Sequence, residues 1–299
     1  MFKNMIVYRI GPEWSATAAQ LDAALQAGRF TECGASQEKS VGWIEPRGAA
    51  HGALVEAVDG QLIFQLMIET RVLPGSVVTR KVKERVARIE ALSGRKPGKK
   101  ETRDIRDDIR LELLPMTFTK QASVWVWIDP KARTLVIDAA SQAKADEVVT
   151  LLVKSLDGLA LALLGTKCSP TTAMAAWLIS RDPPSGFSVD RECELKAADE
   201  SRAVVRYARH PLDTAEVRGY VESGKLPTRL ALTWNGRVSF VLTEGLLLKK
   251  LAFLDVVFEA VTAGKEDGFD SDVAIATGEL RKLLADLVAA LGGEVLVAT

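Results

Sequence analysis

The feature that most constrains the fold is the stretch 74–114, where apolar residues have helical spacing although the stretches on both sides read as β-strands. From 74 to 92 apolar residues recur every three or four positions, and Leu92 is the last of them. The segment 94–98, Gly-Arg-Lys-Pro-Gly, then interrupts the helix, because glycine and proline disfavour a helix interior. The helical spacing returns from 99 to 114. The sequence therefore predicts an antiparallel helical hairpin with a basic turn.

The charges of this predicted hairpin are unevenly distributed. From Arg80 to Arg103 there are ten basic and three acidic residues, a net charge of +7. At 100° per residue the second helix carries a basic stripe of Lys99, Arg103, Arg106 and Arg110, an apolar stripe of Ile105, Ile109 and Leu113 beside it, and an acidic stripe of Glu101, Asp104 and Asp108 roughly opposite the basic one. Cations gathered on one face favour contact with a phosphate backbone. The alternative is an ordinary solvated helix face.

The chain as a whole is neutral, with 39 Lys and Arg residues against 39 Asp and Glu residues. Neutrality by itself argues against a nucleic-acid partner, because non-specific affinity comes from neutralised phosphates. The region from Asp255 to Glu279, however, has a net charge of −6. The charge is therefore polarised along the chain, and this distribution matters more than the sum.

The rest of the chain mixes strand and helix signals, which predicts an α+β fold with mixed sheets and helices in two to three subdomains. The expected strands are 2–10, 61–72, 123–128, 134–138, 202–208, 228–234 and 237–243, and the expected helices are 15–27, 141–156, 213–222 and 277–291. Ser15 and Ser141 are predicted helix caps, and Val149, Leu152, Val153 and Leu156 the inward face of the second of these helices. Asn235 and Gly236 give the sharpest hairpin-turn signal.

These elements suggest a division into three parts. We expect residues 1–73 and 115–165 to form a central α+β subdomain, 74–114 the basic helical hairpin, and 166–299 a C-terminal α+β subdomain.

Motifs of catalytic, metal or cofactor sites are missing from the sequence. The two histidines, His51 and His210, have neither HExxH spacing nor neighbouring cysteines or carboxylates at metal-ligand spacing. The segment 94–100 has three residues between its glycines instead of the four of a phosphate-binding loop, and no dinucleotide fingerprint occurs. We therefore expect no enzyme activity, metal, cofactor or small-molecule substrate. A nucleic-acid-processing enzyme would need a carboxylate cluster or a histidine site.

Cysteine usage and hydropathy indicate the compartment. The three cysteines, Cys33, Cys168 and Cys193, are far apart and predict neither a disulfide framework nor a zinc cluster, which fits a reducing cytosol. No apolar run approaches the roughly 18 residues of a membrane span, and the N-terminus lacks the pattern of a secretory signal. We expect a cytoplasmic protein without a membrane-spanning segment.

Aromatic residues leave one question open. Phe118 lies at the junction between the second helix of the hairpin and the next strand, where core packing is the default role of an aromatic side chain. The alternative is an exposed apolar finger that contacts or wedges DNA. The tryptophans that we expect in the core are Trp43, Trp125, Trp127, Trp177 and Trp234.

Short segments distributed in order over nearly the whole chain match those of a known family. They include Phe2-Lys3-Asn4, Cys33-Gly34, Gly42-Trp43, Leu113-Leu114-Pro115 with Phe118, Trp127-Ile128-Asp129, Lys154-Ser155-Leu156, Gly186-Phe187, Thr277-Gly278-Glu279-Leu280 and Leu291-Gly292-Gly293-Glu294. Each match is short, but their combination argues against chance, and with them the chain resembles the RdgC family of recombination-associated proteins.

The resemblance implies a ring-shaped homodimer that encircles duplex DNA in a basic central channel and competes with the RecA recombinase. It also implies that Phe118 engages DNA as a protruding finger. Arg209 and His210 occupy the place where relatives have a basic or polar pair at the closing interface of the channel. Here the sequence departs from the family pattern, because His210 is followed by Pro211. A ring explains how a neutral chain binds DNA, since cations concentrate on the inner surface.

The combined interpretation is a cytoplasmic, nucleoid-associated homodimer that binds double-stranded DNA without sequence preference and limits RecA-mediated recombination. The alternative is a protein-interaction scaffold without direct DNA binding. The expected DNA-binding residues are Lys81, Arg85, Arg88, Arg95, Lys96, Lys99, Lys100, Arg103, Arg106, Arg110, Phe118, Arg209 and His210.

Overall fold

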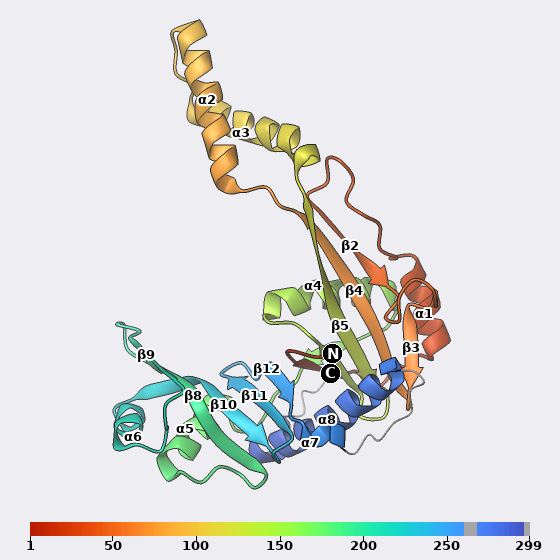
Figure 1. The fold of residues 1–299 in the computed structure, drawn as a ribbon, viewed down its shortest axis with the longest axis vertical. Helices are drawn as coiled ribbons and strands as arrows, with labels where there is room; N and C mark the ends of the chain where they lie inside the picture. The colour runs from red at the N-terminus through yellow and green to blue at the C-terminus, as the bar shows by residue number, and fades with distance from the viewer. Residues whose placement is uncertain (260–267, 296–299) are drawn as a thin grey trace. The chain divides into compact units, whose positions relative to one another are not determined.

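The computed structural model describes residues 1–259 and 268–295 and has a mixed α+β fold with two antiparallel sheets (Figure 1). The predicted α+β class is confirmed. The chain forms two compact units. The first consists of Met1–Ala24, Glu45–Phe64 and Trp125–Thr299, and the second of Leu25–Ile44 and Gln65–Val124.

The first sheet has the strand order β2-β4-β5-β6-β1-β7, and β3 also pairs with β4. Its strands are β1 (Ile6–Ile10), β2 (Lys39–Ile44), β3 (Val55–Val58), β4 (Gln61–Arg71), β5 (Thr119–Asp129), β6 (Thr134–Ile137) and β7 (Leu161–Leu163). The strands β4 and β5 have 11 residues each, and each contributes residues to both units. The chain thus enters the second unit a second time along β4 and leaves it along β5.

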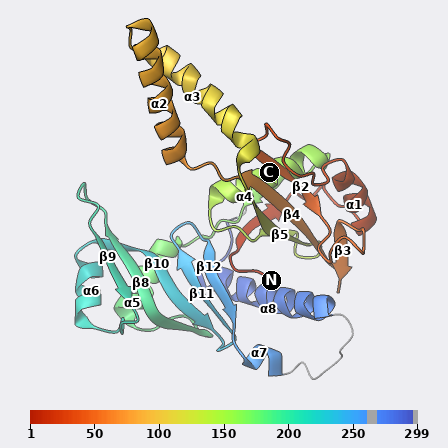
Figure 2. The same ribbon diagram turned by 45° about the horizontal axis from the view of Figure 1, so that its top comes forward.

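The second sheet lies in the first unit and has the order β12-β11-β10-β8-β9. Its strands are β8 (Phe187–Ala197), β9 (Val204–Ala208), β10 (Lys225–Trp234), β11 (Val238–Thr243) and β12 (Leu248–Phe253). The described helices of this unit are α1 (Ala18–Gln26), α4 (Gln142–Ser155), α5 (Pro170–Ser180), α6 (Ala215–Glu222), α7 (Val256–Glu259) and α8 (Gly268–Ala290). The last two residues of α1 belong to the second unit. Helices α5 and α6 pack on β10 (Figure 2).

Apolar residues of β8, β10 and β11 form one buried core with α5 and α8. Trp234 at the end of β10 is buried and donates a hydrogen bond from its indole Nε1 to Asp286 Oδ2 on α8, at 2.8 Å. The predicted hairpin turn follows, with Asn235 and Gly236 at φ values of 48° and 62°. Two consecutive positive φ values match the twist of paired strands.

The second unit contains two helices, α2 (Gly75–Ser93) and α3 (Lys99–Leu113), and the short 3-10 turn η1 (Leu114–Met116). We call α2 and α3 together the α2–α3 pair, which Figure 1 shows in orange and yellow. α2 ends at Gly94, whose φ of 66° lets its N–H donate to the carbonyl oxygen of Glu90. The predicted helices 74–92 and 99–114 are therefore present within one residue at each end.

Two details of the predicted helices are wrong, namely the cap of α1 and one inward residue of α4. α1 is capped by Thr17 and not by Ser15: Thr17 N–H donates to Gln20 Oε1 at 2.9 Å and Gln20 N–H donates to Thr17 Oγ1 at 3.3 Å. This reciprocal capping box satisfies two backbone donors, which a cap at Ser15 would leave unpaired. Ser141 is the N-cap residue of α4, as predicted, although its side chain makes no capping hydrogen bond. Leu152 and Leu156 are buried as predicted, but Val153 is 46% exposed because the buried face also runs through Ala145 and Val148.

Several elements were not predicted, namely β2, β3, β7, β8, β12, α5, α7 and the first part of α8. β8 alternates buried positions such as Cys193 and Leu195 with charged ones such as Glu192 and Glu194, and its charges hid the pattern of a strand. α8 begins at Gly268, nine residues before the predicted start at Thr277. Within the predicted acidic region, Lys265, Glu266 and Asp267 lie outside the described residues.

The tryptophan prediction is largely confirmed. Trp43, Trp127, Trp177 and Trp234 are buried, whereas Trp125 is half-buried and packs against Phe269 with ring centroids 6.2 Å apart. In the two described ranges, no helix combines the length and the hydropathy needed to cross a membrane.

Two glycine substitutions test the packing. A Cβ on Gly42 in β2 would lie 2.4 Å from the Cα of Phe30, a backbone atom that cannot move aside cheaply. We expect Gly42→Ala to lower the free energy of unfolding by roughly 3 kcal/mol, in the range of core-disrupting changes. The matched control is Gly278→Ala in α8, where a Cβ meets nothing within 4 Å. Gly278→Ala should raise the free energy of unfolding by about 0.4–1 kcal/mol. Urea unfolding measures both, and equal effects would contradict the packing at Gly42.

Candidate nucleic-acid interface

The structure places all thirteen predicted site residues at the surface, where each is exposed. Eleven of them belong to the second unit, on the α2–α3 pair, its turn, or the junction with β5. The other two, Arg209 and His210, belong to the first unit and follow β9. The predicted site residues from 81 to 118 therefore lie in one unit, and the other two lie in the other unit.

A small apolar core orients the cations of the α2–α3 pair. Val78 and Val82 of α2 pack against Ile105 and Ile109 of α3, and all four are buried. Half-buried Val86, Ile89 and Leu113 pack against this core, as the apolar spacing predicts. Leu92 does not, because it lies near the end of α2 and is 80% exposed. Since the apolar faces meet each other, the basic side chains of both helices face solvent.

Four of these cations form ion pairs. The pairs are Lys81 with Glu84 (3.0 Å), Arg85 with Glu112 (2.9 Å), Arg95 with Glu101 (3.1 Å) and Arg110 with Glu38 (3.5 Å). The pair that joins the two helices is bidentate, with two hydrogen bonds from Arg85 to Glu112. These hydrogen bonds hold the pKa of Glu112 below its usual range. All four pairs are exposed to solvent, so they are weak and can exchange partners.

The remaining cations of this set form no ion pair with any residue in the described ranges. They are Arg88, Lys96, Lys99, Lys100, Arg103 and Arg106. Lys96, Lys99 and Lys100 lie at the turn between the helices, and Arg103 and Arg106 continue along α3. Of the predicted basic stripe, Arg110 alone is paired within the described part of the chain. Six side chains are thus free to bind an anion.

Phe118 is 89% exposed, so its core-packing interpretation is wrong. The neighbouring Met116 is 79% exposed. Leu114, which directly follows α3, is buried and only 2% exposed. We call Met116 and Phe118 the apolar prominence. Sequence reasoning missed Met116, although it lies in the same segment as Phe118 and no helical or strand periodicity assigned it to the core. Two large apolar side chains are thus exposed on one short segment, and Met116 lines a pocket together with Lys81, Arg85 and Arg88.

Local contacts hold Arg209 and His210. Arg209 has a φ of 56°, which is uncommon for a residue with a Cβ. The His210 N–H donates to the carbonyl oxygen of Arg191 at 3.1 Å, and its ring lies 5.4 Å from the ring of Tyr207. The imidazole Nδ1 lies 2.7 Å from the carbonyl oxygen of Pro211.

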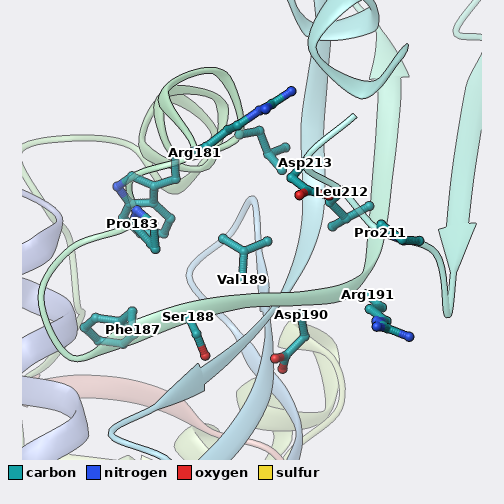
Figure 3. A pocket seen from close by; sticks show the side chains of 12 residues that line it. Arg181, Pro183, Phe187, Ser188, Val189, Asp190, Arg191, Pro211, Leu212 and Asp213 are labelled. Atoms are coloured by element: carbon teal, nitrogen blue, oxygen red, sulfur yellow. The ribbon is translucent and has the colours of Figure 1, made fainter. Parts of the chain in front are cut away.

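A pocket of about 600 Å³ lies beside this loop, lined by residues of α5, β8 and the segment 211–213 (Figure 3). Trp177, Val189 and Leu212 give it an apolar lining, while Arg181 and Arg191 are balanced by two carboxylates, Asp190 and Asp213. Charges of both signs give the pocket no preference for an anion. Among the described residues, no group of three His, Cys, Asp or Glu side chains could hold a metal ion.

Comparisons with known proteins identify relatives over nearly the full length. Residues 1–294 match the family model described as "Putative exonuclease, RdgC". The chain is 45% identical over 303 residues to the recombination-associated protein RdgC of Dechloromonas aromatica (strain RCB), covering 99% of both chains. It is also 45% identical over 297 residues to the protein of that name from Janthinobacterium sp. (strain Marseille), and 45% identical over 296 residues to that from Herminiimonas arsenicoxydans, each with 98% of both chains covered.

The exposure of Phe118 predicts a small effect on stability. Phe118→Ala should change the free energy of unfolding by no more than about 0.5 kcal/mol, as for other surface positions. Leu114→Ala is the matched control four residues earlier and should cost about 2–5 kcal/mol, because that side chain is buried. Thermal and urea unfolding measure both variants. Equal losses would place Phe118 in the core.

Proposed function

The chain belongs to the RdgC family, and from this premise we propose that it binds double-stranded DNA without sequence preference and without cleaving it. The observation that carries the proposal is the set of six exposed cations on the α2–α3 pair that have no ion-pair partner among the described residues. Met116 of the apolar prominence lines a pocket together with Lys81, Arg85 and Arg88, which supports the proposal further. The relatives are recombination-associated proteins by name, which fits a DNA partner.

The chemistry of these side chains favours phosphate over base contacts. Lysine and arginine donors neutralise phosphates and release counterions, which supplies affinity but carries no sequence information. The exposed pairs of Arg85 and Arg95 can exchange their carboxylates for phosphates at little cost. Neither α2 nor α3 carries an asparagine or glutamine, the side chains that read adenine in a groove. Non-specific binding is therefore the simpler function for this surface.

The resemblance to relatives extends the proposal to assembly. We propose a homodimer that closes into a ring around duplex DNA, is nucleoid-associated, and limits access of RecA. A ring holds DNA topologically, so that a chain of zero net charge can retain it with moderate electrostatic affinity. This proposal keeps three subdomains: a central one of residues 1–73 and 115–165, the helical hairpin of residues 74–114, and a C-terminal one of residues 166–299. Arg209 and His210 contribute to the proposed DNA-binding surface.

The description of the family model names a different activity, an exonuclease. The two functions are separable in one experiment, because binding requires no cleavage of the phosphodiester backbone. An end-labelled duplex incubated with the protein and Mg²⁺ should stay at full length. Progressive shortening that requires Mg²⁺ would overturn the non-enzymatic part of the proposal.

Duplex affinity measured across a salt series tests the binding itself. If the six unpaired cations contact phosphates, the logarithm of the association constant should fall against the logarithm of salt concentration with a slope of about −5 for each bound protomer. Duplexes of unrelated sequence should give the same affinity and slope. No binding at low salt would overturn the proposal and favour the protein-interaction scaffold.

Charge reversal on α3 tests the location of the site. Arg103→Glu/Arg106→Glu should weaken duplex binding at least tenfold and make the salt slope shallower by about 2, because each lost phosphate contact removes about one unit. The matched control, Lys154→Glu/Lys282→Glu, changes the net charge equally at exposed positions of α4 and α8 in the first unit. It should affect binding much less. Equal losses in the two variants would mean that net charge, and not this surface, determines affinity.

A further inference from the structure

The turn that carries Met116 and Phe118 is attached to the sheet by one side chain, Arg71 at the end of β4. The half-buried Arg71 guanidinium donates from Nη1 to the carbonyl oxygens of Leu114, at 3.1 Å, and Thr117, at 3.2 Å. These two carbonyls lie in η1 and directly before Phe118. The turn is closed internally as well, because Thr117 Oγ1 donates to the Leu114 carbonyl at 2.8 Å.

The same guanidinium also binds a second segment. Its Nη2 donates to the carbonyl oxygens of Cys33, at 3.3 Å, and Gly34, at 3.1 Å, in the loop before β2. The backbone at this point is fixed too, because Arg71 N–H donates to Glu38 O and Val72 N–H donates to Phe118 O, both at 2.9 Å. All these residues belong to the second unit. Arg71 thus joins the turn before Phe118 to the loop at Cys33 and to β4, the strand on which Arg71 itself lies.

Glu69, two residues earlier on β4, contacts the same loop at Cys33. Its buried carboxylate accepts a hydrogen bond from the Cys33 N–H at 2.5 Å and one from Gln121 Nε2, on β5, at 3.1 Å. The Cys33 N–H lowers the pKa of Glu69, so this group stays an ionised acceptor. The loop at Cys33 is therefore fixed independently, and it provides a rigid support on which Arg71 holds the turn.

Only arginine has the geometry for this role. Its planar guanidinium carries five donors that point in fixed directions, whereas lysine has a single nitrogen that cannot reach two separate segments at once. The exposed side chains of the turn, in contrast, make no contribution to a core. Without an external constraint, a flexible turn could fold Met116 and Phe118 onto nearby apolar surface and remove them from water.

We propose that Arg71 is the positioning residue of the apolar prominence, and that it holds Met116 and Phe118 in the exposed geometry in which they engage DNA. The inference rests on the proposed function. A side chain presented on a fixed backbone loses less conformational entropy on binding than one on a flexible turn, so that preorganisation raises affinity. Arg71 itself donates to protein carbonyls and needs no contact with DNA.

A double-mutant cycle on duplex affinity tests this role. Phe118→Ala should weaken binding about tenfold, the loss expected when an aromatic side chain that is partly buried against the duplex is removed. Arg71→Ala should weaken binding by a similar factor in the wild-type background. In the Phe118→Ala background it should cause less than a twofold further loss, because Arg71 acts through the prominence. Losses that multiply, or an Arg71→Ala variant that binds like wild type, would overturn the inference.

Arg71→Lys guards against a variant that fails to fold, because it keeps the charge and loses the bridging geometry. It should show the same coupling to Phe118, together with faster hydrogen exchange of the segment 114–118 and unchanged exchange in the α2–α3 core. Slow exchange in that segment would overturn the inference by showing that the turn is held without Arg71.

The matched control is Arg133→Ala in the first unit, since the Arg133 guanidinium also donates to backbone carbonyls, those of Ile10, Gly11 and Trp14. It should lower stability without coupling to Phe118. If the wild type fails to bind duplex at all, the proposed function falls and this inference falls with it. If wild type and Phe118→Ala differ but the Arg71 variants behave like wild type, the inference alone falls.

Discussion

The packing of Val78 and Val82 against Ile105 and Ile109 is the contact on which the α2–α3 pair depends. Isolated helices of 19 and 15 residues rich in charge are marginal in water, so their stability must come from the face that they bury against each other. Burial of each such side chain is worth about 1.5–3 kcal/mol. Because these apolar stripes face inward, the lysines and arginines between them have no position left except the solvent side. The same contact therefore makes the helices stable and presents their cations.

The second unit combines this charged surface with apolar side chains that stay outside any core. Met116 and Phe118 are exposed although Leu114, on the same turn, is buried. The backbone hydrogen bonds around Arg71, Thr117 and Val72 explain how such a turn keeps its shape without burying its own apolar side chains. Stability is thus supplied by the backbone and by polar contacts, which leaves the apolar surface available for a partner.

The proposed DNA interface also clarifies why a neutral chain needs no global excess of positive charge. Exposed cations attract phosphates over a distance of roughly 8–10 Å at physiological salt, so that only charges near the contact matter. Several acidic residues of the first unit make structural contacts instead. Asp286, for instance, accepts a hydrogen bond from the Trp234 indole. Glu279, for example, forms a bidentate pair with Arg237, which lowers the pKa of its carboxyl.

The sequence by itself determined the elements whose signal is local. Apolar spacing of three and four located α2 and α3, and Asn235-Gly236 located the turn between β10 and β11, because helix periodicity and positive φ depend on neighbouring residues. The division into subdomains and the DNA role of the thirteen site residues stay predictions.

Tertiary structure decided which way ambiguous side chains face. Phe118 and Trp127 are both aromatic residues at or in β5, yet one is 89% and the other 1% exposed. Likewise, ion pairs separated Arg85 and Arg110 from the unpaired Arg103 and Arg106. Burial and pairing depend on residues distant in sequence, such as Gln61 beside Trp127 and Glu38 beside Arg110, and no local pattern contains them.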